Sequence, residues 1–248
     1  MAEVFPLRIG FFTDVYVPQI NGVSVQVSLL AHSLREAGHE VTVFAPRFPG
    51  YDDVEEPVHR VTSLPYMKLP PVYVALPGDL RTFQALRHEP YDVLHTHTPV
   101  TVGFLAYLSA RYKRVPLVYT YHTSITDYTH YLKLIGGTRL IRRAARRFSA
   151  ITANASDIIV APSAKMERVL IEQRVRRPIR VVPGGIDLER FYAPGPRGEW
   201  RHKLGLPPDG LLLMFAGRLA AEKSIDFLIE AFAHAAAANP SLHFVLAG

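Results

Sequence analysis

The sequence predicts a doubly wound α/β fold, in which helices cover both faces of a mainly parallel sheet. Short apolar runs, typical of buried strands, alternate with longer stretches whose apolar residues have helical spacing. The first unit has an apolar run at 7–13, a helical pattern at 23–37 that Gly38 ends, and a second apolar run at 40–45. Strands separated by helices pair in parallel, because the chain crosses back over the sheet between them.

The same alternation continues as far as residue 183. The predicted later elements are strands at 91–97, 116–121, 157–162 and 179–183, and helices at 100–112, 138–148 and 163–173. The stretch 46–78 is rich in proline, so we expect an irregular surface connection there, with one strand at 58–63.

Glycine and proline at 184–196 interrupt the alternation and mark a domain boundary. We predict an N-terminal domain at 1–190, a linker at 191–210 and the start of a second domain at 211–248.

That second part offers only a strand at 211–216, a helix at 222–238 and a strand at 242–247. One parallel pair cannot bury the apolar residues on both of its faces. We therefore expect the second domain to be incomplete and the chain to be a fragment of a longer protein.

Composition limits the possible classes of function. With 48% apolar and 20% charged residues, the chain is globular rather than disordered. The absence of cysteine excludes disulfides, thiolate metal sites and cysteine nucleophiles. No apolar run is long enough for a membrane span and no leader is recognisable, so we expect a cytoplasmic protein. The net charge of +6, carried mostly by arginine, favours an anionic ligand or surface.

The predicted helix at 138–148 concentrates this charge on one face. The cationic face comprises Arg139, Arg142, Arg143, Arg146 and Arg147, and the apolar face comprises Leu140, Ile141, Ala144, Ala145 and Phe148. Two compatible interpretations follow. The helix packs on the sheet through Leu140 and Phe148, or its arginines lie on the anionic inner face of the cell membrane, with which the protein associates peripherally.

Ligands of open α/β sheets bind beyond the carboxyl ends of the strands, where helix amides meet anions. After the first strand, Asn21 and Gly22 directly precede a helical pattern. A glycine here lets a phosphate approach the first amides of the helix. A tight Asn-Gly turn without a ligand explains the same residues equally well.

Histidines stand at the ends of two other predicted strands. His95 and His97 point to the same side of an extended strand, but no third ligand is near in sequence, so a metal site is not favoured. His122 is placed to hydrogen-bond a sugar hydroxyl or to stabilise charge, or else to bond within its own loop. Asp127 is a candidate acceptor for an incoming hydroxyl and equally a candidate helix cap.

A pair of cations follows the strand predicted at 211–216. Gly217 and Arg218 come directly after that strand, and Lys223 lies about one helical turn further on. Helix starts usually carry acids, so paired cations favour a clamp for the charge of a departing diphosphate over a merely solvated helix start.

Five segments resemble, in order, the motifs of the retaining, GT-B-fold glycosyltransferases of family four. They are 12–23 (FTDVYVPQINGV), 95–99 (HTHTP), 120–123 (TYHT), 183–187 (PGGID) and 217–223 (GRLAAEK). The first segment, together with YTHYL at 128–132, is most similar to members that glycosylate diacylglycerol from UDP-glucose or transfer mannose from GDP-mannose.

The resemblance implies a complete N-terminal Rossmann-like domain followed by the first strand, helix and strand of a second, facing domain, with the active site in the cleft. It implies these site residues: Asn21, Gly22 and Gly217 at the nucleotide-sugar donor, His122 at the donor sugar, Arg218 and Lys223 at the leaving diphosphate, and Asp127 and Tyr128 at the acceptor. It further implies that the acceptor hydroxyl attacks on the face from which the nucleotide leaves, with retention and without a metal or other cofactor.

The paired-glutamate motif of the family has no match in these residues, so we expect the 248 residues alone to be inactive or nearly so. The main alternative is a noncatalytic module that binds anionic lipid or nucleic acid through the arginine-rich helix. Nucleic acid is not expected as a partner, because no aromatic stacking pattern accompanies the charge. A glycoside hydrolase is not favoured either, because no convincing pair of facing carboxylates is present.

Overall fold

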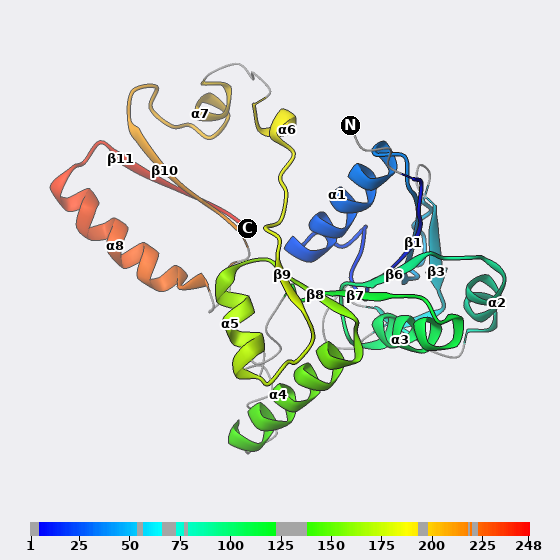
Figure 1. Ribbon diagram of the computed structural model, residues 1–248. Helices are drawn as coiled ribbons and strands as arrows, with labels where there is room; N and C mark the ends of the chain where they lie inside the picture. The colour runs from blue at the N-terminus through cyan, green and yellow to red at the C-terminus, as the bar shows by residue number, and fades with distance from the viewer. Residues whose placement is uncertain are drawn as a thin grey trace. The chain divides into compact units, whose positions relative to one another are not determined.

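The computed structural model describes residues 5–53, 57–65, 73–76, 79–122, 138–192, 198–217, 219 and 223–248. The chain divides into two compact units, Met1–Asp187 and Leu188–Gly248. The first unit is built on a seven-stranded sheet in which every neighbouring pair is parallel (Figure 1). Its strands are β1 (Arg8–Phe12), β2 (Glu40–Pro46), β3 (Val58–Val61), β6 (Val93–Thr96), β7 (Leu117–Thr120), β8 (Ile158–Ala161) and β9 (Ile179–Val181). The predicted parallel α/β fold is confirmed.

The order of the strands across the sheet is β3-β2-β1-β6-β7-β8-β9. The chain runs outward from β1 to β3 and then returns to place β6 on the other side of β1. The boundary between β1 and β6 is therefore a topological switch point, where open α/β sheets bind ligands beyond the carboxyl ends of their strands. Because Phe12 lies beside Thr96, the loops that follow β1 and β6 start next to each other.

Helices cover both faces of this sheet. They are α1 (Gly22–Glu36), α2 (Leu80–His88), α3 (Thr101–Lys113), α4 (Thr138–Ala155) and α5 (Ala164–Glu172). On one face, Val27 and Ala31 of α1 join a buried cluster with Phe11 of β1. On the opposite face, Phe12 belongs to a cluster formed with α2 and α3. Neighbouring phenylalanines thus point to opposite faces, as the period of a strand requires.

Three elements of the first unit depart from the prediction. The proline-rich stretch contains an antiparallel hairpin of β4 (Ser63–Pro65) and β5 (Tyr73–Ala75), and no element was expected where α2 lies. In α2 the residues Leu80 and Phe83 are exposed, whereas Thr82 and Leu86 are buried. Leu80, Phe83 and Leu86 recur at helical spacing although only Leu86 is buried, and the helix begins at the cap Asp79, whose carboxylate accepts from the Arg81 amide at 3.3 Å.

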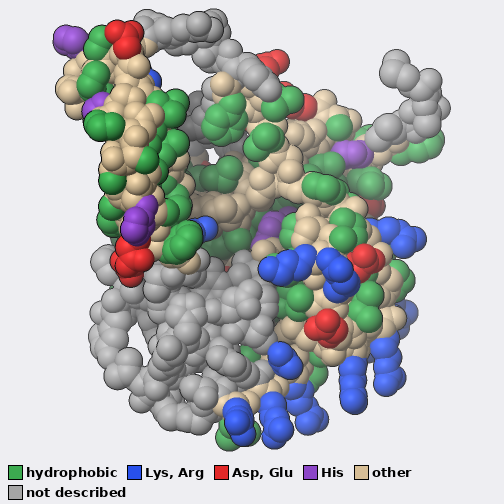
Figure 2. Space-filling model, turned by 90° about the vertical axis from the view of Figure 1, so that its left-hand side faces the viewer, with side chains coloured by type: hydrophobic (Ala, Val, Ile, Leu, Met, Phe, Trp, Pro, Cys, Tyr) green, Lys and Arg blue, Asp and Glu red, His purple; other side chains and the backbone are tan. Residues whose placement is uncertain are grey.

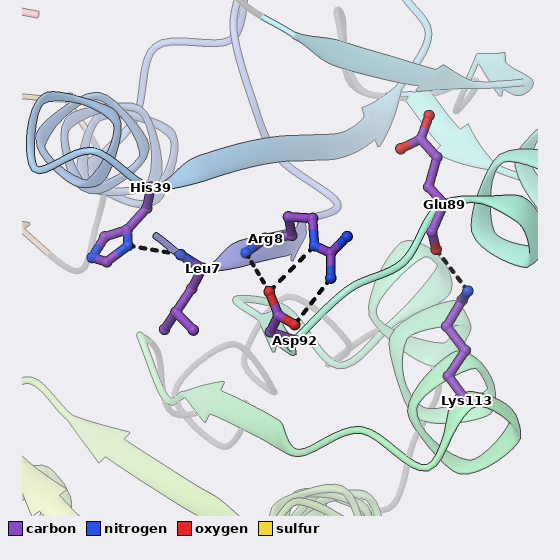
Figure 3. Close-up of polar contacts among 6 residues, drawn as sticks. All are labelled: Leu7, Arg8, His39, Glu89, Asp92 and Lys113. Atoms are coloured by element: carbon purple, nitrogen blue, oxygen red, sulfur yellow. Dashed lines mark hydrogen bonds and ion pairs between the residues drawn. The ribbon is translucent and has the colours of Figure 1, made fainter. Parts of the chain in front are cut away.

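Polar contacts close the amino-terminal edge of the sheet (Figure 3). The Asp92 carboxylate accepts from the backbone amide of Arg8 at 2.8 Å and from its guanidinium at 3.4 Å. Lys113 Nζ donates to the carbonyl oxygen of Glu89 at 2.7 Å, and the Leu7 amide donates to His39 Nδ1 at 3.2 Å. These contacts satisfy backbone groups between elements at this edge of the sheet.

The second unit contains a parallel pair of strands with one long helix. Its elements are α6 (Leu188–Tyr192), α7 (Glu199–Lys203), β10 (Leu211–Ala216), α8 (Ile225–Ala238) and β11 (Leu242–Ala247). Helix α7 lies within the range expected to be a linker. Leu211, Leu213 and Leu246 are exposed on the strands, in agreement with the expectation that a single pair cannot bury them.

Candidate functional site

The loops after β1, β6 and β7 extend the sheet beyond its carboxyl edge. The amide of His97 donates to the Phe12 carbonyl oxygen at 2.8 Å, and the amide of Tyr121 donates to that of Val160 at 2.9 Å. These bonds fix the first residues of the loops after β6 and β7 as firmly as the strands themselves. Side chains placed here by the sequence therefore have defined directions at the switch point.

Asp14 joins the loop after β1 to the start of α3. Its Oδ2 accepts from Thr98 Oγ1 at 2.6 Å. Its Oδ1 accepts from the amides of Thr101 and Val102 at 3.0 and 2.7 Å and from Thr101 Oγ1 at 2.5 Å. Val100, the residue before the helix, makes no side-chain cap of its own. Asp14 is thus a helix cap supplied from another loop, and its charge suits the positive end of the helix dipole.

Sequence reasoning missed this role of Asp14, because a cap is normally sought directly before its helix. Two features of the sequence together could have indicated it. An acidic residue follows one strand, and the helix that starts after Thr98 and Pro99 has no capping residue directly before it. The combination becomes informative only when the strand order places β1 beside β6.

Helix α3 also approaches the end of β6 at very short range. A Cβ atom on Gly103 would lie 1.6 Å from the carbonyl oxygen of Thr98 and 2.8 Å from Thr96 Oγ1. No side chain fits there without displacing backbone. Gly103 therefore sets how closely the helix packs against the loop that carries His97 and Thr98.

A histidine cluster, consisting of His95, His97 and His122, lies on the α1 side of this edge. His97 Nδ1 and His122 Nε2 are 3.0 Å apart and share a hydrogen bond. His95 Nε2 is bonded to Thr120 Oγ1 at 2.7 Å. The His95 and His97 rings stack with centroids 4.2 Å apart, and Phe11 packs against both in T-shaped arrangements. The structure thus brings together the two histidine-bearing loops that the sequence placed 25 residues apart.

Burial lowers the pKa of all three imidazoles. The pKa of His95 falls to about 3, because burial disfavours the charged ring and a charge on His122 would repel it. Burial lowers the pKa of His122 to about 4. The pKa of His97 lies well below its usual value, again mainly through burial and further through its histidine neighbours. The cluster is therefore neutral near pH 7 and acts through hydrogen bonds.

The geometry of the histidine cluster is that of hydrogen-bonded rings. Two imidazole nitrogens that bind one metal ion each point at the ion at about 2.0–2.1 Å. Here Nδ1 of His97 and Nε2 of His122 point at each other. Within the described part of the chain, no group of three or more His, Asp or Glu side chains is arranged to hold a metal ion.

The start of α1 leaves one amide open. The Asn21 side chain accepts from the amides of Val23 and Ser24 at 3.0 Å, and Ser24 Oγ accepts from the Asn21 amide in return. The Asn21 carboxamide oxygen thus caps the helix. Among the described residues nothing accepts from the Gly22 amide, and a Cβ on Gly22 would meet no atom within 4 Å. Packing does not require a glycine at this position. An anion that approaches the amide would require one, because a side chain would stand in its way.

The loop after β9 lies against the same helix. Gln26 Nε2 donates to the Gly185 carbonyl oxygen at 2.7 Å. A Cβ on Gly184 would lie 2.5 Å from Gln26 Oε1, so this glycine permits the contact. The segment 183–187 therefore contacts the helix that follows the segment 12–23, within the first unit.

The remaining candidates are only partly described. In the second unit, Gly217 has a φ of 150°, and its amide donates to the Ala247 carbonyl oxygen at 2.8 Å, while Lys223 is exposed. Arg218, Asp127 and Tyr128 lie outside the described residues.

The predicted packing of α4 through Leu140 and Phe148 is wrong. Leu140 is 74% exposed and Phe148 is 43% exposed, whereas Ser149, Thr152 and Ala153 are buried. Thr152 Oγ1 donates to the carbonyl oxygens of Phe148 and Ser149, both at 3.0 Å, which satisfies its hydroxyl inside the protein. Small residues with internally bonded hydroxyls can therefore form the buried side, and the large apolar residues remain outside.

The outward side of α4 is both cationic and apolar. The exposed arginines are Arg139, Arg143, Arg146 and Arg147, while the side chain of Arg142 lies outside the described residues. In the view of Figure 2, Lys and Arg side chains gather along the lower edge of the picture. Leu140, Phe148 and Ile151 are exposed on the same helix. In the described residues no helix is long and apolar enough to cross a bilayer.

The fold and these motifs define a class of protein. The Glycosyltransferase Family 4 model matches residues 20–190. The chain belongs to this family.

Relatives with assigned names support that membership. The chain is 32% identical over 255 residues to the alpha-monoglucosyldiacylglycerol synthase of Acholeplasma laidlawii, covering 98% of this chain and 63% of the relative. It is 33% identical over 228 residues to a GDP-mannose-dependent alpha-mannosyltransferase of Mycobacterium tuberculosis, and the match covers 90% of this chain and 58% of the relative. The chain spans 56% of the length of a second monoglucosyldiacylglycerol synthase, from Streptococcus pneumoniae, at 28% identity over 98% of this chain.

Solved structures show the same fold. Anabaena HepE in complex with UDP-glucose matches 97% of this chain, with a TM-score of 0.69 at 20% identity, over 60% of its own length. Sucrose-phosphate synthase from Thermosynechococcus elongatus matches 97% of this chain, with a TM-score of 0.66 at 20% identity, over 62% of its own length. The first unit is accordingly a Rossmann-like domain of the GT-B type.

Proposed function

We propose that the full-length protein transfers a hexose from a nucleotide sugar, UDP-glucose or GDP-mannose, to the hydroxyl of a membrane lipid such as diacylglycerol, with retention at the anomeric carbon. The observation that carries this proposal is the open Gly22 amide at the carboxyl edge of the sheet that bears the histidine cluster. An anion and a polyhydroxylated ligand are the partners that such an edge suits.

The donor diphosphate is assigned to the start of α1. Because Asn21 already occupies the amides of Val23 and Ser24, the Gly22 amide is the group left to meet a phosphate oxygen. The helix dipole adds favourable potential at the same place. Arg218 and Lys223 are assigned to the leaving diphosphate, since guanidinium and ammonium groups neutralise the charge that develops as the nucleotide departs.

The donor sugar is assigned to His122. A neutral imidazole can donate one hydrogen bond and accept another, which suits a hydroxyl better than a fixed charge does. In the proposed reaction the acceptor oxygen attacks the anomeric carbon on the face that the nucleotide leaves. The bond from that carbon to the diphosphate oxygen breaks, and the acceptor proton passes to the departing phosphate. No side-chain nucleophile, metal or other cofactor is needed.

The acceptor side is assigned to the membrane surface, with Asp127 and Tyr128 as acceptor-binding residues. Helix α4 presents arginines beside exposed Leu140 and Phe148, the combination found in helices that lie in an anionic lipid interface. Relatives named monoglucosyldiacylglycerol synthase support a lipid acceptor. We place the protein on the inner face of the cell membrane. The second candidate, a noncatalytic lipid-binding module, is favoured by the same helix but leaves the open Gly22 amide unexplained.

The first test measures transfer by the full-length protein. We expect labelled glucose or mannose to pass from its nucleotide to diacylglycerol in mixed vesicles, with an α-linked product by NMR. Gly22→Val should raise KM for the donor about tenfold or more, because the new side chain keeps phosphate from the amide, a loss of at least one charge-assisted bond. The melting temperature should stay within about 1 °C, since the site is open.

A matched control introduces the same side chain at another exposed helix start. Ala164→Val, at the first residue of α5, should leave both KM and the melting temperature unchanged. Vesicle binding without transfer from either nucleotide sugar would instead support the noncatalytic module. An unchanged donor KM in Gly22→Val would remove Gly22 from the donor site.

The second test addresses the membrane surface. Replacing Arg139, Arg142, Arg143, Arg146 and Arg147 with glutamine should abolish binding to anionic vesicles in a flotation assay, since each cation near such a surface contributes on the order of 1 kcal/mol. The double variant Arg143→Gln/Arg147→Gln should weaken binding by about tenfold or more. A control with the same charge change on α2, Arg81→Gln/Arg87→Gln, should bind as the parent protein does. Equal loss in both double variants would show a general charge effect and remove α4 as the membrane surface.

A further inference from the structure

The inner histidine of the cluster has an unusual hydrogen-bonding state. His97 is 2% exposed, and its Nε2 atom is buried without a hydrogen-bond partner among the described residues. Its other ring nitrogen, Nδ1, faces Nε2 of His122 at 3.0 Å. Because both rings are neutral, each carries one N–H, and a single proton lies between the two nitrogens.

Only two arrangements of that proton are possible. If His122 Nε2 carries it, then His97 must hold its own proton on Nε2, where a buried N–H would have no acceptor. If His97 Nδ1 carries it, then His97 Nε2 is a bare lone pair, and only an acceptor is left unsatisfied. Buried donors without acceptors are rarer than under-satisfied acceptors. The second arrangement is therefore the favoured one.

The consequence concerns the outer histidine. In the favoured arrangement His122 Nε2 accepts from His97, so the one proton of His122 must lie on Nδ1. We propose that His97 is a positioning residue that fixes His122 as the Nδ1–H tautomer, so that His122 presents a hydrogen-bond donor to an oxygen of the donor sugar. This inference rests on the proposed function for the identity of the ligand, but the tautomer itself follows from the geometry.

The surroundings hold His97 in the orientation that this role needs. The ring of His95 stacks on the His97 ring with centroids 4.2 Å apart, and Phe11 packs against the His97 ring in a T-shaped arrangement with centroids 4.6 Å apart. His95 is itself tied to Thr120 by its Nε2 atom. The His97 ring cannot turn to offer Nε2 to His122 without breaking the stack, so the packing keeps Nδ1 directed at His122.

The direct experiment is NMR of the full-length protein labelled with ¹⁵N-histidine. Long-range proton–nitrogen spectra distinguish a protonated ring nitrogen from a bare one, and a His122→Phe variant assigns the His122 signals. We expect His122 to show a protonated Nδ1 and a bare Nε2 near pH 7, and His97 to show a protonated Nδ1. A protonated Nε2 on His122 in the parent protein would overturn the inference, whether or not any variant folds.

Two substitutions of His97 test the positioning role. The side-chain nitrogen of asparagine occupies the place of Nδ1, so His97→Asn keeps the donor to His122. The side-chain nitrogen of glutamine occupies the place of Nε2, so His97→Gln removes the donor to His122. His122 should keep its Nδ1 proton in His97→Asn and become a mixture of tautomers in His97→Gln. His59→Gln, which keeps the bond of that position to Thr82 and lies outside the histidine cluster, is the control and should leave His122 unchanged.

Kinetics complete the test. We expect kcat/KM for the nucleotide sugar to fall about tenfold in His97→Gln, the loss of about one hydrogen bond, and to recover within about threefold in His97→Asn. Equal losses in both variants would show a merely structural role. If the parent protein shows the expected tautomer but transfers no sugar, the proposed function fails and the tautomer assignment stands. If it transfers sugar with the opposite tautomer, the inference about His97 fails and the function stands.

Discussion

Replacing Gly103 with alanine is expected to lower the free energy of unfolding by about 4 kcal/mol, the upper end of what overpacking causes. The added Cβ would lie 1.6 Å from the Thr98 carbonyl oxygen, a backbone atom that cannot move aside alone. Helix α3 would have to withdraw from the loop after β6. Intrinsic helix propensity works in the opposite direction, because alanine is favoured over glycine by about 1 kcal/mol in a helix interior. Urea titration followed by circular dichroism measures the difference.

A second glycine provides the control for this substitution. Gly22→Ala adds the same methyl group to a helix, at a place where a Cβ meets nothing within 4 Å. Its unfolding free energy should change by less than about 0.5 kcal/mol. Similar values for the two variants would show that α3 does not pack against Thr98 as described.

Replacing Asp14 with alanine is expected to cost about 3 kcal/mol of stability, because two helix amides and two hydroxyls lose their acceptor and the helix dipole loses a charge. Asp14→Asn should cost less, since one carboxamide oxygen can still accept from α3. Thermal unfolding should rank the parent protein first, Asp14→Asn second and Asp14→Ala last.

The comparison that isolates this effect is Asp52→Ala, the same loss of charge at an exposed position. It should shift the unfolding free energy by less than about 0.5 kcal/mol. If Asp14→Ala unfolds at the same temperature as Asp52→Ala, the carboxylate does not hold the start of α3.

The sequence predicted the parallel sheet because its signals are local. Apolar runs such as 40–45 and 116–121 are buried strands in the structure, and Gly38 follows α1 as expected. Helix α2 escaped prediction although Leu80, Phe83 and Leu86 recur at helical spacing, because the helix has only nine residues and follows directly on the proline-rich stretch. The side of α4 that is buried was predicted wrongly for another reason: Ser149 and Thr152 are polar by type but satisfy their hydroxyls internally.

The site was predicted as separate pieces and not as an arrangement. Gly22 and His122 were recognised from their places after strands, and their proposed roles remain predictions. The direct contact between His97 and His122, and the cap that Asp14 provides, depend on which strands are neighbours. Strand order is decided by long-range packing, which no local pattern in the sequence records.

The pairing of β1 with β6 also constrains how the first unit folds. The partners in that pairing are far apart along the chain, as are Asp14 and Thr98, which are 84 residues apart. During synthesis β1 can meet β2 early, but it must wait for β6 before its second edge is covered. Until then that edge exposes unpaired backbone groups, and loop-closure entropy slows their capture. We therefore expect the nascent chain to depend on protection from aggregation until β6 has left the ribosome.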